Sequence, residues 1–167
     1  FLWAKNIGGS TTDEAYGVAV DANGNAFVTG RFQGMADFNP GSGTDNLTAS
    51  GSTDDIFVCK FDASGNFVWA KSMGGTGNDV GLSIALDAGG NVYITGYFYS
   101  TVDFNPGGGA LTLTAPGGGS DIFICKLNSS GDFVWAKNFG DTGWDVGYDI
   151  AVDANGTVFA TGRFEGT

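Results

Sequence analysis

The side chains of this chain that could take part in chemistry are mostly carboxylates. The 167 residues include 18 acidic residues, 7 basic residues and no histidine, which gives a formal net charge of −11. Without histidine, the chain cannot itself build a Ser-His-Asp triad, a Cys-His pair or a histidine-ligated zinc site. The strong negative charge repels phosphate backbones, so nucleic acid is an unfavourable partner. Carboxylates could still act as acid–base pairs or as ligands of a hard cation.

One short motif could bind calcium. The sequence Asp-Phe-Asn-Pro-Gly occurs twice, beginning at Asp37 and at Asp103. Asp37 alternates with Asn39, and Asp103 with Asn105, so the two oxygens of each pair can lie on one side of an extended segment. Nearby carbonyl groups could then complete the shell of a calcium ion. The alternative is an Asx–Pro turn that reverses a hairpin.

A second set of carboxylates recurs at intervals of 66 residues, just ahead of a predicted strand: Asp13, Asp79 and Asp145. A catalytic centre needs groups of different kinds with different pKa values, which three identical positions do not provide. We therefore predict that these carboxylates accept hydrogen bonds from loop amides or pair with a lysine such as Lys5.

Aromatic residues that break the repeat are candidates for ligand or partner contacts. Trp144 has Thr12 and Asn78 at the equivalent positions, and Tyr97 and Tyr99 replace Arg31 and Gln33. The tryptophans that do recur, by contrast, are predicted to pack between repeats: Trp3, Trp69 and Trp135.

The elements that position these residues come from an internal repeat. The segment Phe67-Val-Trp-Ala-Lys71 returns as Phe133-Val-Trp-Ala-Lys137 and has a close counterpart at Phe1-Leu-Trp-Ala-Lys5. The spacing of 66 residues divides the chain into units 1–66 and 67–132 and a partial unit 133–167. A fixed period of this kind indicates stacked supersecondary units that cannot bury their apolar faces alone.

Each unit is predicted to be a four-stranded antiparallel meander. Alternating or β-branched and aromatic residues predict strands at 16–20, 25–32, 55–61 and 67–71. Asp21-Ala-Asn-Gly24 and Asp62-Ala-Ser-Gly65 predict tight turns, although the first resembles a calcium loop superficially. The Gly-rich stretch 33–54 is expected to contain no strand.

The third strand predicts how the units pack. Ile56 and Val58 form one apolar face, and Phe57, Cys59 and Phe61 form the other, so neighbouring sheets must cover both faces. Four-stranded sheets stacked in this way form a β-propeller, of which this chain would supply about two and a half blades in an incomplete ring. A β-solenoid fits less well, because its coils are usually shorter and lack a meander. Cys59 and Cys125 are predicted to be buried free thiols.

Two longer patterns carry a resemblance to a known family. Ile84-Ala-Leu-Asp-Ala-Gly-Gly-Asn-Val-Tyr-Ile-Thr-Gly96, and Asp121-Ile-Phe-Ile-Cys-Lys-Leu-Asn-Ser-Ser-Gly131 followed by Trp135, resemble the bacterial β-propeller repeat SBBP and distantly the NHL repeats. The resemblance implies a propeller in a secreted or cell-surface bacterial protein, and it implies no particular activity.

The two ends of the sequence do not make up a whole blade. The chain is predicted to open on a fourth strand, Phe1–Lys5, and to end on the first two strands of a unit, for eleven strands in total. We expect either a segment of a longer repeat protein or self-assembly in which copies share a blade.

The favoured function is a non-catalytic extracellular propeller module for protein or glycan interaction, adhesion or self-assembly. No apolar run approaches the ~18–20 residues of a membrane span, and no cofactor is implied unless calcium binds. The alternative is a carbohydrate-active propeller enzyme that uses Asp carboxylates, with calcium as a possible cofactor.

Overall fold

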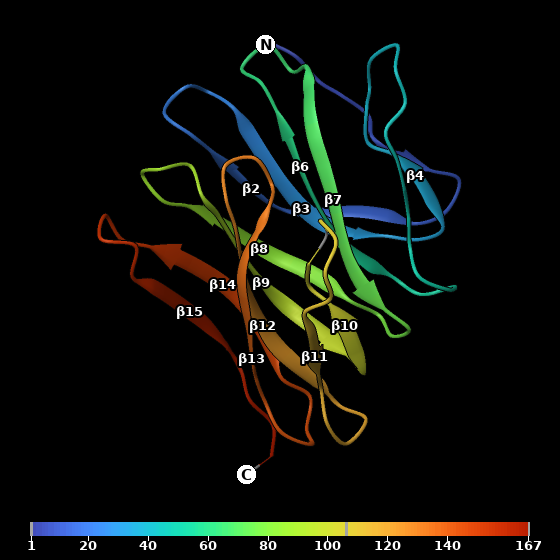
Figure 1. Cartoon of the computed structure of the whole chain (residues 1–167), viewed down its shortest axis with the longest axis vertical. Helices are drawn as coiled ribbons and strands as arrows, with labels where there is room; N and C mark the ends of the chain where they lie inside the picture. The colour runs from blue at the N-terminus through green and yellow to red at the C-terminus, as the bar shows by residue number, and fades with distance from the viewer. Residues whose placement is uncertain (1, 106, 167) are drawn as a thin grey trace.

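The computed structural model describes residues 2–105 and 107–166. Throughout these residues the secondary structure is β, with strands paired antiparallel in sheets and no helix. Consequently, no helix there is long and apolar enough to cross a membrane. The strands form sheets that fan out along the molecule, with the two chain ends at opposite extremities (Figure 1). The prediction of an all-β fold is confirmed.

Two four-stranded meanders, which we call blade 1 and blade 2, are offset from the repeat units, because the fourth strand of each lies at the start of the following unit. Blade 1 contains β2 (Asp13–Val20), β3 (Ala26–Phe32), β6 (Asp55–Phe61) and β7 (Phe67–Gly75), hydrogen-bonded in this order. Blade 2 contains β8 (Val80–Leu86), β9 (Val92–Tyr99), β12 (Ser120–Leu127) and β13 (Phe133–Phe139). After β13, the partial unit supplies β14 (Val146–Val152) and β15 (Val158–Arg163), which pair with each other. These are propeller blades that do not close a ring, and not the coils of a solenoid.

The units stack face to face through their first strands. Strand β8 packs on β2 and β3, and β14 repeats the contact on β8 and β9. Ile56 and Val58 enter the core that joins blade 1 to blade 2, whereas Phe57 and Cys59 enter a separate core on the opposite face. The alternation of the third strand therefore separates two hydrophobic cores, as its sequence predicts.

Two short hairpins, reversed at the Asp-Phe-Asn-Pro-Gly motifs, add strands to the predicted four per unit. The stretch 33–54 contains β4 (Met35–Asp37) and β5 (Asn46–Thr48), and blade 2 has the equivalent β10 (Thr101–Asp103) and β11 (Thr112–Thr114). Strand β10 extends the sheet of blade 1, because Asp103 pairs with Gly74 at the end of β7. Strand β4 pairs in the same way with β1 (Gly8–Gly9). The β10–β11 hairpin thus ties blade 2 to the outer strand of blade 1.

An aromatic anchor holds each of these hairpins to its blade. Phe104 is fully buried, with its ring centroid 5.3 Å from that of Phe98 and 5.0 Å from that of Phe123. Phe38 occupies the same position in the first unit, 4.9 Å from Phe57. The phenylalanine of each Asp-Phe-Asn-Pro-Gly motif therefore faces the core, while the flanking polar residues face the turn.

The prediction of a strand at Phe1–Lys5 is wrong for the residues that the structure describes, since residues 2–7 form no strand and Phe1 lies outside them. The equivalent residues of β7 pair with β6, whereas residues 2–7 pair with no strand among the described residues. With the hairpins and β1, the described residues hold fifteen strands in place of the expected eleven.

The two cysteines are buried free thiols, as predicted. Cys59 and Cys125 are both fully buried, and burial raises the pKa of Cys59 to about 12 and that of Cys125 still further. The Cys125 thiol lies 3.7 Å from Sδ of Met73, across the junction of the two blades. Both thiols act as small apolar core groups.

Candidate functional site

The tight turns that join β2 to β3, β6 to β7 and their counterparts gather at one end of the blades, which we call the turn face. In the first of them, Oδ1 of Asp21 accepts hydrogen bonds from the amides of Asn23 and Asn25, each at 2.9 Å. Gly24 has a φ of +80°, a conformation that favours glycine. The prediction that this sequence forms a tight turn is confirmed.

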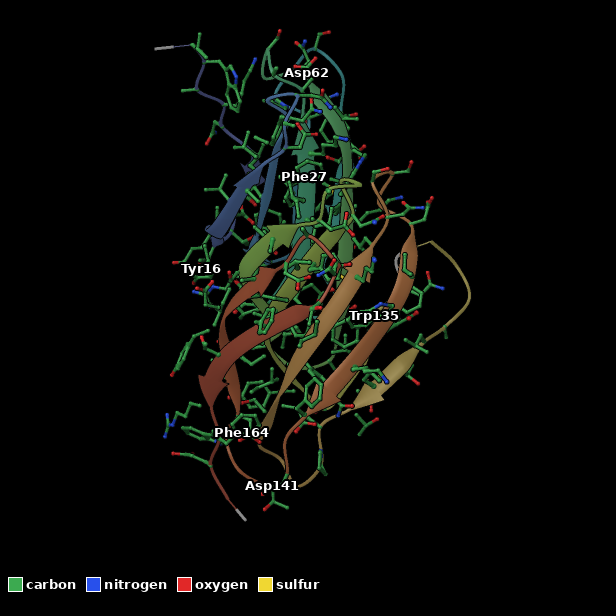
Figure 2. All side chains as sticks on the ribbon, turned by 90° about the vertical axis from the view of Figure 1, so that its left-hand side faces the viewer. Tyr16, Phe27, Asp62, Trp135, Asp141 and Phe164 are labelled. Carbon is green, nitrogen blue, oxygen red and sulfur yellow. The ribbon has the colours of Figure 1, made fainter. Side chains whose placement is uncertain are left out.

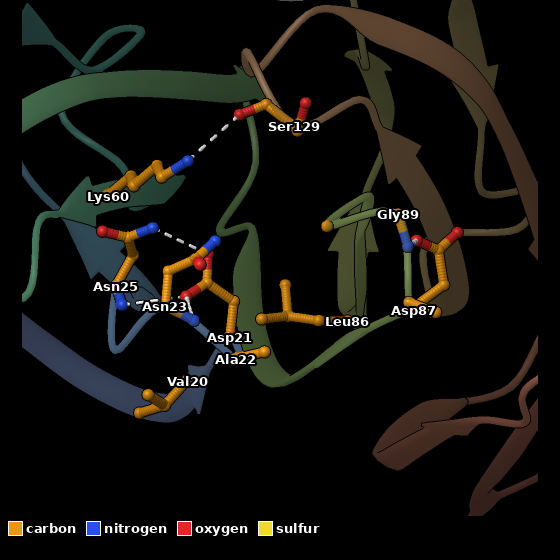
Figure 3. Close-up of a pocket in the computed structure, with 12 residues that line it drawn as sticks. Val20, Asp21, Ala22, Asn23, Asn25, Lys60, Leu86, Asp87, Gly89 and Ser129 are labelled. Carbon is orange, nitrogen blue, oxygen red and sulfur yellow. Dashed lines mark hydrogen bonds between the residues drawn. The ribbon is translucent and has the colours of Figure 1, made fainter.

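A cleft of about 480 Å³ lies between the blades on the turn face (Figure 3). Its walls are the β2–β3 turn, the β8–β9 turn and the β12–β13 turn, so both blades contribute. Lys60 of β6 extends across it, with Nζ 3.5 Å from the carbonyl oxygen of Ser129 and 4.8 Å from the ring centroid of Phe27. An ammonium group is thus held over an aromatic face at the boundary of two repeats.

The same cleft recurs one unit later, with a volume of about 320 Å³. Lys126 occupies the position of Lys60, and its Nζ lies 4.7 Å from the ring centroid of Tyr93. Here Asp87 adds a carboxylate: its Oδ2 lies 3.6 Å from Nζ of Lys126 and accepts a hydrogen bond of 3.1 Å from the Tyr93 hydroxyl. The Tyr93 hydroxyl, followed by the charge of Asp87, raises the pKa of Lys126 despite partial burial.

The chemistry of the two clefts suits binding. Burial acts to raise the pKa of Asp21, but the hydrogen bonds from Asn25 and Asn23 outweigh it and lower the pKa. The pKa of Asp87 is lowered by the same balance. Both carboxylates are therefore ionised at neutral pH and already accept hydrogen bonds, so they hold no proton to donate. The lysine ammonium groups are the donors that a partner would meet.

Two of the recurring tryptophans, Trp3 and Trp69, pack between repeats as predicted, whereas Trp135 contacts Tyr93 within its own blade. The indole of Trp69 lies 6.1 Å from the ring of Phe27 in blade 1 and packs against Gly131 of blade 2, where an added Cβ would lie 3.1 Å from it. Trp3 packs likewise beneath the β6–β7 turn, and its Nε1 donates to the carbonyl oxygen of Ala63 at 3.1 Å. These rings therefore pack beneath the tight turns that form the turn face.

The unrepeated aromatic residues lie at the opposite end of the strands. Tyr97 and Tyr99 contact each other on β9, with centroids 6.0 Å apart and perpendicular rings, and burial raises the pKa of Tyr97. Trp144 is 58% exposed in the loop before β14, where its backbone bridges Ser120, the residue that also pairs with Tyr99. A ligand or partner role for these three residues stays a prediction.

The predicted calcium ligands lie at the tips of the short hairpins. Oδ1 of Asp37 accepts hydrogen bonds from the amides of Asn39 and Asp45, both at 2.9 Å, and Oδ1 of Asn39 accepts one from Gly41. Asp103 and Asn105 make the equivalent bonds. These are the Asx-turn bonds of the alternative interpretation. Residues 2–105 and 107–166 contain no cluster of three acidic or cysteine side chains suited to a metal ion. Calcium at these positions stays a prediction.

The recurring aspartates ahead of each first strand tie loops to strands. Oδ2 of Asp79 accepts from the amide of Gly75 at 2.9 Å, and Oδ1 accepts from that of Tyr99 at 3.0 Å. Asp145 makes the equivalent pair of bonds. Asp79 is fully buried, and this burial raises its pKa to about 8 against the lowering effect of the two amides. The predicted capping of loop amides is confirmed.

The sequence analysis did not identify the two cleft lysines, Lys60 and Lys126, as candidate binding residues. The signal available was their recurrence at the same point of the third strand, in Cys59-Lys60-Phe61 and Cys125-Lys126-Leu127. A charged residue kept between two inward-facing apolar residues points to a position on the opposite side of the strand. The turns that complete each cleft come from the neighbouring unit, so only the stacking brings them together.

Comparison with known proteins agrees with this architecture. Residues 2–31 match the family model described as SBBP, beta-propeller repeat. This segment is therefore similar to an SBBP repeat. The match covers the β2–β3 hairpin, whose equivalents recur in the next two units as β8–β9 and β14–β15. The resemblance of the chain to the SBBP repeat is therefore confirmed, and its fold is that of propeller blades.

Two relatives cover almost the whole chain. It is 29% identical over 187 aligned residues to the "Uncharacterized WD repeat-containing protein L264" of Acanthamoeba polyphaga mimivirus, an alignment that includes 98% of this chain. It is 26% identical over 161 residues to the "Regulatory protein FlaEY" of Caulobacter vibrioides, with 94% of this chain aligned. The chain spans only 13% and 16% of the lengths of these proteins.

Proposed function

We propose that this chain is a non-catalytic segment of a β-propeller that binds a partner protein through the clefts of its turn face. One observation carries the proposal: the cleft at Lys60 recurs at Lys126, again between the first turns of two neighbouring sheets and with an aromatic ring below each ammonium group. Two copies of one polar cleft, side by side, suit a partner that makes several weak contacts at once.

The partner we propose is a protein surface that presents carboxylates or carbonyl oxygens to the two lysines. Both ammonium groups lie over aromatic rings. Most side-chain carboxylate oxygens of the clefts already accept hydrogen bonds from amides of the turns. An acceptor on a partner protein would therefore gain a charge-assisted hydrogen bond from each lysine. The name of the mimivirus relative, a WD repeat-containing protein, supports a repeat scaffold. We further propose that the module acts at the cell surface or after secretion, in adhesion, display or assembly.

Charge reversal tests the binding role. A double variant, Lys60→Glu with Lys126→Glu, should lose retention of a partner that wild-type protein binds saturably. Lys137 is an exposed lysine of β13 outside both clefts, so Lys137→Glu is the matched control and should retain the partner. Equal retention by all three proteins would contradict the role of the clefts.

Two further measurements address location and catalysis. Antibodies against the folded module should label intact cells of the source organism, and labelling only after permeabilisation would contradict a surface role. A panel of glycans should show no turnover by wild-type protein. Asp149 is a carboxylate of β14 that accepts a hydrogen bond of 2.6 Å from the Ser83 hydroxyl. Turnover that is lost in Trp144→Ala or in Asp149→Asn would support the carbohydrate-active alternative in place of the binding module.

A further inference from the structure

The two clefts of the turn face differ in what lies beside their lysines. In the second cleft, Oδ2 of Asp87 lies 3.6 Å from Nζ of Lys126 and compensates its charge. In the first cleft, Nζ of Lys60 has no carboxylate of residues 2–105 and 107–166 within ion-pairing distance. Its contact is with a neutral group, the carbonyl oxygen of Ser129 at 3.5 Å. One lysine therefore carries its own counter-charge, and the other does not.

A tyrosine hydroxyl fixes the carboxylate of the second cleft. The hydroxyl of Tyr93 donates to Oδ2 of Asp87 at 3.1 Å, and the side chain of Asn91 donates to the same oxygen at 2.8 Å. The ring of Tyr93 also lies beneath Lys126, so one side chain holds both charged groups together. Because this ring is only 1% exposed, it has little room to move, and the ion pair is part of the folded protein.

The first cleft has no such hydroxyl. The ring beneath Lys60 is Phe27, which lies in blade 1, in the upper half of Figure 2. Asp21 occupies the position of Asp87, and its Oδ2 accepts a hydrogen bond of 2.7 Å from the side chain of Asn25, but Phe27 has no group to donate to it. Asp21 therefore stays with its own turn, and Lys60 extends away from it toward the next unit (Figure 3).

This difference in charge compensation determines which acceptor suits each lysine. A carboxylate that approached Lys126 would compete with Asp87 and would be repelled by its like charge, whereas a neutral carbonyl oxygen would not. A carboxylate at Lys60 would gain a charge-assisted hydrogen bond without that competition. Asp87 lines both clefts, but its pairing with Lys126 reduces the repulsion that a carboxylate at Lys60 meets. The first cleft is also the larger, at about 480 Å³ against 320 Å³.

We infer that the two clefts recognise different acceptors on one partner segment: Lys60 binds a carboxylate, and Lys126 binds a neutral carbonyl or amide oxygen. Tyr93 and Asp87 determine this specificity, because together they place a carboxylate of the chain itself where that of the partner would bind. The partner is a peptide segment that presents an acidic side chain to the first cleft and an uncharged acceptor to the second. The inference rests on the proposed function, since it assigns the chemistry of the same clefts.

Nuclear magnetic resonance of the lysine side chains tests this assignment on the whole chain. Two tripeptides, Gly-Glu-Gly and Gly-Gln-Gly, each acetylated and amidated at its ends, are titrated at constant ionic strength while the Cε signals are followed. At Lys60 the glutamate peptide should bind at least about tenfold more tightly than the glutamine peptide, as expected for a hydrogen bond between charged groups. At Lys126 the two affinities should agree within about threefold. The exposed Lys137 lies outside both clefts and reports non-specific pairing.

Variants of the second cleft should change its specificity. Asp87→Asn removes the competing charge and should strengthen glutamate-peptide binding at Lys126 at least about tenfold, which creates a second carboxylate site. Tyr93→Phe releases Asp87 and should act in the same direction, so it serves as the second variant if the first does not fold. Asp62→Asn is the matched control, because Asp62 caps the same kind of turn near the top of Figure 2 and lies outside both clefts. It should leave both affinities unchanged.

The possible outcomes separate this inference from the proposed function. An equal preference for the glutamate peptide at Lys60 and Lys126 in the wild type would overturn the inference and leave the binding role of the clefts intact. No gain at Lys126 in either variant would do the same. No saturable binding of either peptide at either lysine would also overturn the inference, whereas the proposed function is contradicted separately, by equal partner retention in the charge-reversal assay.

Discussion

Gly81 of β8 lies against Thr29 of β3 so closely that a β-carbon on Gly81 would collide with the Thr29 hydroxyl and lie 3.2 Å from Cγ2 of Ile56. The hydroxyl has little freedom to move away, since it donates a buried hydrogen bond of 2.8 Å to the carbonyl oxygen of Phe57. Gly147 and Thr95 repeat the relationship at the next junction. This close approach sets the distance at which one blade stacks on another.

Gly81→Ala should therefore destabilise the protein, with a free energy of unfolding lower by about 1–3 kcal/mol, as overpacking of cores generally gives. Chemical denaturation measures the change. Gly107→Ala is the matched control, because its nearest neighbour would lie 3.6 Å from the new β-carbon and its φ is not positive. The control should be neutral or slightly stabilised, and an equal loss in both variants would contradict tight stacking at Gly81.

One position of the first strand tests the energetic value of stacking. Ile84 is 7% exposed beneath blade 1, whereas its equivalent Val18 is 68% exposed on β2. Ile84→Ala should lower the free energy of unfolding by about 2–5 kcal/mol, and Val18→Ala should change it by less than about 0.5 kcal/mol. Similar costs at the two positions would mean that the neighbouring blade contributes little to burial.

Two buried aspartates predict how stability depends on pH. Burial raises the pKa of Asp55 to about 6 and that of Asp79 to about 8, from an ordinary value of 3.8. The folded state therefore binds more protons than the unfolded state between these values, and stability falls as the pH rises from 4 through 6 to 8. Urea denaturation at several pH values measures this slope.

Asp55→Asn removes one of the two groups and should flatten the slope up to pH 6. Asp62→Asn is the control. Hydrogen bonds from Asn66 lower the pKa of Asp62, so this residue changes the free energy of unfolding only at pH values below its ordinary pKa. The dependence of stability on pH above that value should be the same as in the wild type. A wild-type stability that rises steadily between pH 4 and 8 would contradict the assignment, since both raised pKa values act in the opposite direction.

Chelation tests the remaining calcium candidates. Because Oδ1 of Asp37 and of Asp103 already accepts two backbone amides each, we expect the Tm to be unchanged by a chelator and by added calcium. A large fall in Tm with the chelator that calcium restores would instead show that these hairpin tips bind the ion.

The two thiols give a simple test of burial. Cys59 and Cys125 should not react with a thiol reagent in the native protein, because both are fully buried and their pKa values are raised. Both should react at once in denaturant. Rapid labelling of either cysteine without denaturant would mean that a blade face is open.

The strands and their faces could be predicted because the relevant signals are local. Alternation in Ile56-Phe57-Val58-Cys59 places side chains on two faces, and a sheet with two apolar faces needs two covers. The spacing of 66 residues then supplies identical neighbours as those covers. Those inferences require no knowledge of how distant segments meet.

The short hairpins and the clefts depend on contacts between units, which the sequence does not display. Strand β10 has only three residues, and it is stabilised by pairing with Gly74 and by the burial of Phe104. Lys60 likewise becomes part of a cleft only because the β12–β13 turn of blade 2 places the carbonyl oxygen of Ser129 beside its ammonium group. Residues 2–7 illustrate the converse, since a strand-like sequence forms no strand without a partner.

Nuclear Overhauser effects across the blade junctions test the stacking of repeats most directly. The account predicts cross-peaks between the α-protons of Gly81 and the Cγ2 methyl of Ile56, and equivalent cross-peaks between Gly147 and Ile122, because each pair lies in contact across a junction. Absence of both sets, with the cross-strand signals within each sheet intact, would show that the sheets do not stack face to face and would contradict the account.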